Sequence, residues 1–289
     1  MDYLIHLAIL VGIYLILCQA FNLTFGLGRL LNLAHVASFA LGAYATALLS
    51  TELQYGTVIC LSASMLVAAF FALIIGGISL KLSGDYFALG TLAFTAVVSA
   101  LLKNWKSLTH GVLGIVSIPR PELFGIDFYD NRNFLCFVVA VDVVVLSLLS
   151  LTFYGKLGRT LRAQAEDDNL TRTLGYDTRA IRNDAFIISS LVAGLSGGMF
   201  AYFINYIDPS MFELNEMVFV LSAIVVGRPG SFLGVLAATT FLVLLPEPLR
   251  FIGIPSDILG PMRQLLHALI LFAAVYLNRK TLFPPERRV

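Results

Sequence analysis

Six apolar runs in this chain are each long enough to cross a lipid bilayer, and they constrain its fold more than any other feature. A helix needs about 17–25 mainly apolar residues to span the hydrocarbon core. The six runs cover residues 4–21, 33–49, 58–80, 86–102, 134–153 and 185–206. Only 13% of the 289 residues are charged, whereas soluble domains contain roughly a quarter. The sequence therefore predicts an integral membrane protein.

The pattern within these runs favours helices over a β-barrel. Strands of a membrane barrel alternate apolar and polar residues over about ten positions, but residues 138–141 read Val-Val-Ala-Val. No positive charge precedes the first run and no small-residue cleavage site clearly follows it. We therefore expect the first run to be a retained helix rather than a signal peptide.

Positive charges predict how the chain is oriented. The longest polar stretch of the second half, residues 154–184, contains Lys156, Arg159, Arg162, Arg172, Arg179 and Arg182. Cytoplasmic loops carry an excess of such residues, so we expect this loop and the basic tail at 279–288 to be cytoplasmic. An even number of crossings must then separate them, although only 185–206 and 264–278 read as simple spans.

A broken-helix hairpin at 216–245 accounts for that even number. The stretch is apolar but is split at 227–231 by Gly-Arg-Pro-Gly-Ser, and proline and glycine end helices. We predict two half-length or tilted helices that enter from outside and turn near the inner face, with the N-terminus outside. The expected fold is an all-α polytopic bundle of about eight spanning units, a single transmembrane domain over 1–289.

The polar loop at 154–184 also contains a helical pattern. Leu157, Leu161 and Ala165 recur every four residues with arginines between them, which predicts an amphipathic helix. Asp168 or Asn169 is expected to cap a second, short helix, because such side chains accept hydrogen bonds from free N–H groups at a helix start.

Turns are expected to bound this second helix. Gly175 marks its end, because glycine best tolerates the left-handed conformation there, and a third helix should start at Asp177 or Thr178. Leu170 and Leu174 would then share one side of a projecting helix, which suits insertion into a partner's groove. The alternative is an ordinary solvated loop whose leucines lie on the bilayer surface.

The motifs of this loop point to a known family. Residues 158–163 read Gly-Arg-Thr-Leu-Arg-Ala, residues 166–168 are Glu-Asp-Asp, and residues 173–175 are Thr-Leu-Gly. This pattern resembles the permease subunits of branched-chain amino-acid ABC transporters, specifically the M-type member of the two paired permeases. Further stretches resemble the same family in the same order, namely 26–44, 84–94, 109–121 and 226–234.

The resemblance implies the assembly in which such a chain works. It implies a bacterial inner-membrane heterodimer with a second permease, two cytoplasmic ATPase subunits and an extracytoplasmic solute-binding protein. This chain would then carry out translocation and no bond chemistry, and the Walker sequence of a nucleotide site is absent. The residues expected to couple to an ATPase are Arg159, Arg162, Glu166, Asp167, Leu170, Leu174 and Gly175.

Candidate residues for the solute path are polar or small positions inside the apolar runs. They are Asn32, His35, Gly42, Asp142, Gly227 and Ser231. Asp142 is ionisable within a span, which indicates either function or a structural bond to a neighbouring helix. His35 and Gly42 have helix packing as the alternative role. The break at 227–231 either exposes backbone groups to a solute, as broken transporter helices do, or is only a sharp turn.

Other classes of protein have little support. A net charge of +1 argues against nucleic-acid binding, and the histidines and three cysteines have no metal-ligand spacing, so no cofactor is expected. A stand-alone secondary transporter or channel is the first alternative, and an intramembrane enzyme is the second. Branched-chain, other hydrophobic or aromatic amino acids, short amides and urea all stay open as the solute.

Overall fold

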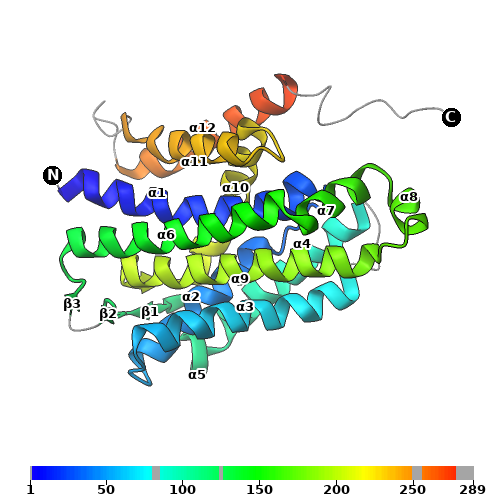
Figure 1. Ribbon diagram of the computed structural model, residues 1–289. Helices are drawn as coiled ribbons and strands as arrows, with labels where there is room; N and C mark the ends of the chain where they lie inside the picture. Colours follow the sequence, from blue (N-terminus) through cyan, green and yellow to red (C-terminus); the bar gives the residue numbers. More distant parts are fainter. Residues whose placement is uncertain (1, 80–84, 124–125, 249–255, 278–289) are drawn as a thin grey trace.

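The computed structural model describes residues 2–79, 85–123, 126–248 and 256–277, and these form a bundle of helices whose longest members lie side by side (Figure 1). The first half contains α1 (Asp2–Phe21), the π-helix η1 (Asn22–Leu27), α2 (His35–Thr51), α3 (Thr57–Ser79), α4 (Asp85–Asn104), α5 (Lys106–Thr109) and the 3₁₀-helix η2 (Gly111–Leu113). The second half contains α6 (Asn131–Tyr154), α7 (Lys156–Glu166), α8 (Asp168–Thr173), α9 (Thr178–Ile204), the 3₁₀-helix η3 (Pro209–Phe212), α10 (Leu214–Gly227), α11 (Phe232–Leu244) and α12 (Ser256–Leu277). The predicted all-α fold is confirmed.

Five of the described helical segments are long and apolar enough to cross a membrane. They are Asp2–Leu27, Thr57–Gly77, Tyr86–Asn104, Asn131–Tyr154 and Thr178–Ile204. At 17 residues, α2 is slightly shorter. The chain is therefore a multi-pass membrane protein, and the apolar runs of the sequence correspond to its helices.

Short strands interrupt the connections between these helices. β1 (Ile115–Val116) pairs antiparallel with β4 (Tyr206–Ile207), and β2 (Glu122–Leu123) pairs antiparallel with β3 (Ile126–Asp127). Each strand is only two residues long, so these pairs hold neighbouring loop segments together and do not form an extended sheet. They lie at the end of the bundle where the chain begins (Figure 1).

Helix α9 is the most enclosed span, and glycines let its neighbours approach it. A methyl group added at Gly194 would lie 2.5 Å from the carbonyl oxygen of Ser64 on α3, and one at Gly197 would collide with the Phe39 carbonyl of α2. Close backbone approach at small residues is how helices associate within a bilayer, where lipid is as apolar as the side chains. Here α9 therefore joins α2 and α3.

The two ends of the bundle carry different elements of the chain. The N-terminus and β2–β3 lie at one end, while α7 and α8 project from the other (Figure 1). If α7 and α8 are cytoplasmic, the N-terminus lies outside, as the charge pattern predicts. The basic tail at 279–288 and the run ends at 80 and 278 lie outside the described residues.

The break expected at 227–231 is present between α10 and α11. These helices contain 14 and 13 residues, so at 1.5 Å per residue each is about 20 Å long, shorter than the roughly 30 Å hydrocarbon core. Arg228 and Gly230 have positive φ values of 66° and 82°. The turn packs on Gly26 of η1, and Gly28, which follows the end of η1, lies against Leu161 of α7. The break therefore lies toward the α7 end.

Two helices begin earlier than their apolar runs. α9 starts at Thr178, as predicted, and so before its apolar run begins at 185, because the Asp177 side chain caps a polar first turn. α12 starts at Ser256 rather than at 264 and continues through Pro261. Apolar length marks where a helix can cross a membrane, whereas capping decides where it begins.

Candidate functional site

The segment predicted to couple to an ATPase folds as two short helices at the tip of the bundle. In α7, Leu161 is fully buried, and the Arg162 guanidinium lies 5.2 Å from the centre of the Phe153 ring on α6. A cation over an aromatic face is attracted to it. The amphipathic pattern therefore holds α7 against the bundle.

Asp167, and not Asp168 or Asn169, caps the second helix, so the predicted cap was wrong by one position. Asp167 has an extended backbone, and its side chain accepts a hydrogen bond from the Leu170 N–H at 2.9 Å. Asp168 instead pairs with Arg172 at 2.8 Å and with Arg182 at 3.0 Å. Its carboxylate ties α8 to α9 and is unavailable as a cap.

The predicted end of the second helix at Gly175 is confirmed, as is the predicted start of the third at Asp177 or Thr178, since α9 begins at Thr178 with Asp177 as its cap. Gly175 has φ of 87°; its N–H donates to the Arg172 carbonyl, and the Tyr176 N–H donates to the Thr171 carbonyl. This pair of bonds is the Schellman arrangement that closes a helix C-terminus. The Asp177 side chain then accepts from two N–H groups of the next helix.

These caps leave apolar side chains exposed at the tip. Leu170 is 58% exposed and Leu174 is 69% exposed, and Tyr176, two residues further along the chain, is 41% exposed. The remaining candidates have local roles: Arg159 donates to the Gly155 carbonyl at 3.3 Å, and Glu166 is exposed at the end of α7. Contact with an ATPase stays a prediction for all seven residues.

Hydrogen bonds from two buried amide side chains at the end of the first span connect it to the break between α10 and α11, and the sequence did not reveal this contact. The Asn22 side chain accepts from the Gly230 N–H at 3.0 Å and donates to the Ser231 carbonyl at 3.2 Å. Gln19 donates to the Phe232 carbonyl at 2.5 Å and accepts from Asn22 at 3.2 Å. Both residues are buried. Two amides three positions apart in an apolar run were the available signal, because buried amides require partners.

The break candidates Gly227 and Ser231 line an open cavity of 490 Å³. The Ser231 hydroxyl accepts from the Gly234 N–H at 3.1 Å and caps α11, and a Cβ at Gly227 would lie 2.6 Å from the Gly234 carbonyl oxygen. Asn22 already bonds the Gly230 N–H and the Ser231 carbonyl. Those two backbone groups are therefore engaged within the chain rather than presented to a solute.

His35 and Gly42 lie in helix contacts. One ring nitrogen of His35 lies 3.0 Å from the Leu17 carbonyl and the other 3.3 Å from the Ser189 hydroxyl. Gly42 lies directly against the Gly194 backbone of α9. Both residues therefore join α2 to its neighbours.

Asn32 and Asp142 are buried and each has one polar atom without a partner. The Asn32 side-chain oxygen accepts from the Ala34 N–H at 3.0 Å, while its Nδ2 has no partner. Asp142 of α6 packs on Gly12 of α1, where an added Cβ would lie 2.5 Å from the Asp142 Oδ2, and its Oδ1 has no partner. Asp142 therefore lies in the α1–α6 contact.

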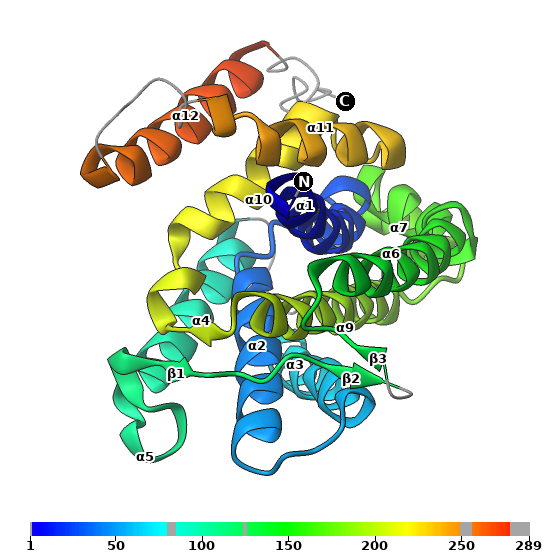
Figure 2. The ribbon, with the colours of Figure 1, turned by 90° about the vertical axis from the view of Figure 1, so that its left-hand side faces the viewer.

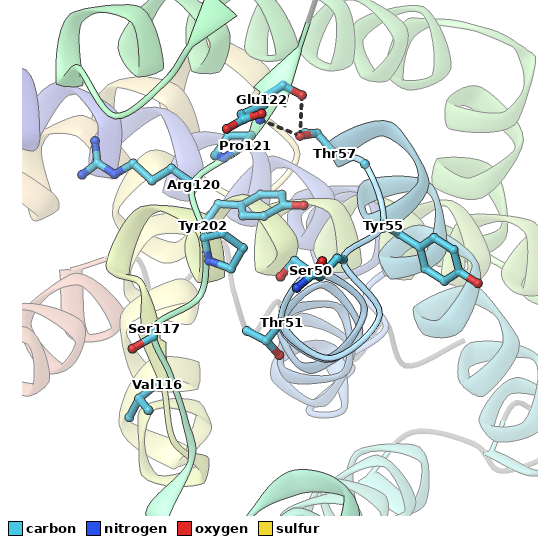
Figure 3. Close-up of a pocket in the computed structure, with 13 residues that line it drawn as sticks. Ser50, Thr51, Tyr55, Thr57, Val116, Ser117, Arg120, Pro121, Glu122 and Tyr202 are labelled. Atoms are coloured by element: carbon cyan, nitrogen blue, oxygen red, sulfur yellow. Dashed lines mark hydrogen bonds between the residues drawn. The ribbon is translucent and has the colours of Figure 1, made fainter. Parts of the chain in front are cut away.

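A polar cavity of 670 Å³ opens at the N-terminal end of the bundle (Figure 3). Its lining includes Ser50, Thr51, Tyr55, Ser117, Glu122 and Tyr202. Arg120 borders it, but its guanidinium points away (Figure 3) and donates to the Tyr129 carbonyl at 2.9 Å and to the Asn131 side chain at 2.7 Å. Arg120 therefore stabilises the loop before α6 and does not present its charge to the cavity.

A smaller groove of 250 Å³ lies between α2, α4 and the start of α10. Its wall is mainly apolar, with hydroxyl groups from Thr95 and Ser99 of α4 and a carboxylate from Glu213. Glu213 forms an ion pair with Lys103 of α4 at 2.7 Å. Viewed from the N-terminal end, α4 and α10 both lie on the same side of α2 (Figure 2).

The site contains no sign of metal chemistry in the part of the chain that the structure describes. Within those residues, no three His, Cys, Asp or Glu side chains are grouped so that they could hold a metal ion. Most of the polar groups described above bond to backbone atoms or ion-pair partners, or line a cavity. Their arrangement can position helices and line a passage.

Comparison with known protein families gives one consistent result. The sequence pattern described as "Branched-chain amino acid transport system / permease component" matches residues 3–275. The high-affinity branched-chain amino acid transport system permease protein LivM of Escherichia coli K12 is 36% identical over 85% of this chain and 63% of its own length. The corresponding LivH protein of Salmonella typhimurium is 25% identical over 76% of this chain and 78% of its own length.

A more distant relative is the probable branched-chain amino acid transport permease protein LivM of Methanocaldococcus jannaschii. It is 22% identical over 78% of this chain and 74% of its own length. No solved structure matches the chain. The chain spans somewhat less than two thirds of the length of the Escherichia coli LivM protein.

Proposed function

Because this chain belongs to the family of permease components of branched-chain amino acid transport systems, we propose that it is one of two paired membrane-spanning subunits of an ATP-driven importer. Its solutes are branched-chain amino acids or related small molecules. Its own role is translocation, while partner subunits hydrolyse ATP. The relatives include both LivM and LivH permeases, which supports pairing with a second permease in the bacterial inner membrane.

The exposed tip of α8 is the observation that carries this proposal. Leu170 and Leu174 are held in the open by a capped start at Asp167 and a closed end at Gly175. A soluble surface does not gain from ordering apolar side chains in water, but a helix that inserts its apolar face into a partner's groove does. We assign this tip as the contact with a cytoplasmic ATPase subunit.

Movement of the tip would reach the membrane through a chain of direct contacts. α7 packs on the end of η1, where Leu161 lies against Gly28. η1 holds the α10–α11 break through the two hydrogen bonds of Asn22. A π-helix is a less stable geometry that is frequent at functional sites. ATP-driven displacement of α7 would therefore shift the break and repack the helices between two access states.

The proposal also sets where the other partners bind. With α7 and α8 in the cytoplasm, the polar cavity beside Tyr202 opens on the opposite side of the membrane. An extracytoplasmic solute-binding protein would deliver its cargo at that end. The second permease would cover part of the lateral surface of the helices, with lipid on the remainder.

The test is affinity capture of the tagged chain from detergent-solubilised native membranes, with identification of the captured subunits. We expect a second permease and ATPases with the wild-type chain, and loss of the ATPases alone with Leu170→Asp or Leu174→Asp. Leu113→Asp is the matched control, because Leu113 is 81% exposed in η2, directly before β1 in the chain, and should retain the second permease and the ATPases.

A different result would identify a different kind of transporter. Capture of the chain alone or as a homo-oligomer would remove the importer proposal and favour a stand-alone secondary transporter or channel. Retention of the ATPases by both aspartate variants would leave the family assignment intact but move the coupling contact away from α8.

A further inference from the structure

The groove between α2, α4 and α10 has features that a lipid-facing surface lacks. Thr95 and Ser99 contribute hydroxyl groups to a cavity of 250 Å³ whose other walls include Leu33, Phe212 and Met217. The groove is thus mainly apolar, with polar groups along one helix. Pockets for small molecules combine these two elements, since apolar walls bind and a few polar groups orient.

The backbone that borders this groove is not helical. Leu33 precedes α2, and its N–H donates to the Thr91 hydroxyl at 3.1 Å rather than to a backbone carbonyl. Its carbonyl accepts from the Thr95 hydroxyl at 3.0 Å. Thr95 lies at the middle of the spanning segment Tyr86–Asn104, and Thr91 lies one turn before it. Irregular backbone at that depth occurs only within protein or beside a water-filled cavity.

A pair of opposite charges stands at the groove. Glu213 lines it and forms the 2.7 Å ion pair with Lys103, and these side chains are 41% and 39% exposed. Glu213 occupies the cap position of α10, but its side chain makes no capping bond there. A partly exposed ion pair contributes little to stability. Replacing this ion pair by contacts to a ligand that carries both charges would therefore cost the protein little stability.

We propose that this groove is a binding site for a small zwitterion with an apolar side chain, on the solute path of the permease. The ligand carboxylate engages the Lys103 ammonium, its ammonium engages the Glu213 carboxylate, and its side chain occupies the apolar walls beside Met217. The proposal rests on the proposed function, because it names the residues that would receive the importer's solute.

Cysteine labelling tests whether the groove is open to water and to this ligand. The assembled transporter with Ser99→Cys in a Cys136→Ser background is treated with a membrane-impermeant maleimide in right-side-out vesicles. We expect labelling, and we expect leucine to slow it several-fold, whereas isovalerate and isoamylamine, which each lack one charge, should not. Leu101→Cys is the matched control, because Leu101 is 47% exposed on the same helix without lining the groove, and it should stay unlabelled.

The labelling outcomes are decisive for the site. An unlabelled Ser99→Cys would mean that lipid or another subunit fills the groove, and equal protection by all three compounds would mean that no zwitterion is recognised. Either result would overturn this site. If the same preparation still contains the second permease and the ATPases, the proposed function would survive that failure.

A charge exchange separates ligand recognition from structural support. Lys103→Met and Glu213→Gln should each lower leucine uptake by the assembled transporter several-fold, with subunit recovery unchanged. The exchange of Lys103→Glu with Glu213→Lys restores an ion pair between α4 and α10 but reverses its direction. We expect uptake to remain impaired in the exchanged protein. Full recovery would show that the pair only joins the two helices, and would overturn its role in recognition.

Discussion

The side chain of Asn22 and the backbone of Gly230 are joined by a 3.0 Å hydrogen bond across 208 positions of the chain. The same amide donates to the Ser231 carbonyl, so one buried side chain satisfies two backbone groups that the helix break leaves free. A broken helix within a membrane needs such partners, because lipid offers none. Asn22 therefore makes the hairpin of α10 and α11 possible at this depth.

Loss of the hydrogen bonds between Asn22 and the α10–α11 break should destabilise the protein. Asn22→Leu preserves the approximate size but leaves buried polar groups without partners, at about 1–3 kcal/mol for each group. We expect a lower melting temperature of the detergent-solubilised chain, followed by tryptophan fluorescence from Trp105 or by aggregation. Asn215→Leu is the control, since Asn215 is exposed on α10. Equal melting temperatures for the two variants would contradict the role of Asn22.

The contact between α2 and α9 should not tolerate a methyl group. A Cβ at Gly42 would collide with the Gly194 backbone, and such overpacking costs about 1–3 kcal/mol or more. Gly42→Ala should reduce the monodisperse yield in size-exclusion chromatography and lower the melting temperature. Gly77→Ala, with nothing within 4 Å of its added methyl, should be neutral or slightly stabilising. A normal yield of Gly42→Ala would show that α2 and α9 pack further apart.

Asp167 should order the tip of the bundle. Its cap on the Leu170 N–H contributes about 1 kcal/mol to the start of α8, which is a large share of the stability of a six-residue helix. Asp167→Ala should speed hydrogen exchange of the α8 amides and weaken ATPase capture, although Leu170 and Leu174 are retained. Asn169→Ala, which alters an exposed neighbour, should change neither. Unchanged exchange in Asp167→Ala would argue against a preformed α8.

Asp142 distinguishes a packing position from a transport residue. A carboxyl group packed on Gly12 with an unpartnered oxygen is costly within a membrane unless it is paired or faces water. Because the structure places it in the α1–α6 contact, we expect Asp142→Asn to raise the melting temperature and to preserve leucine uptake by the assembled transporter. Loss of uptake with normal subunit recovery would instead place Asp142 on the solute path.

Several features of this protein follow from local sequence. The apolar runs specify the spans because crossing a bilayer requires only length and low polarity, which can be counted along the chain. The break at 227–231, the end of α8 at Gly175 and the cap at Asp177 depend on backbone preferences of single residues, and the structure contains all three. The loop motifs were sufficient to indicate the family, which the comparisons confirm.

Other features exist only because distant segments meet. Helical periodicity places Gln19 and Asn22 on one side of the first span, but it contains no information on the element that supplies the partner, so Asn22 could not be assigned to Gly230. The Lys103–Glu213 pair likewise joins α4 to α10 across 110 positions. Even the choice of Asp167 over Asp168 as a cap depended on Arg182 of another helix, which engages the Asp168 carboxylate. Spans were decided by local hydrophobicity, whereas partners were decided by packing in three dimensions.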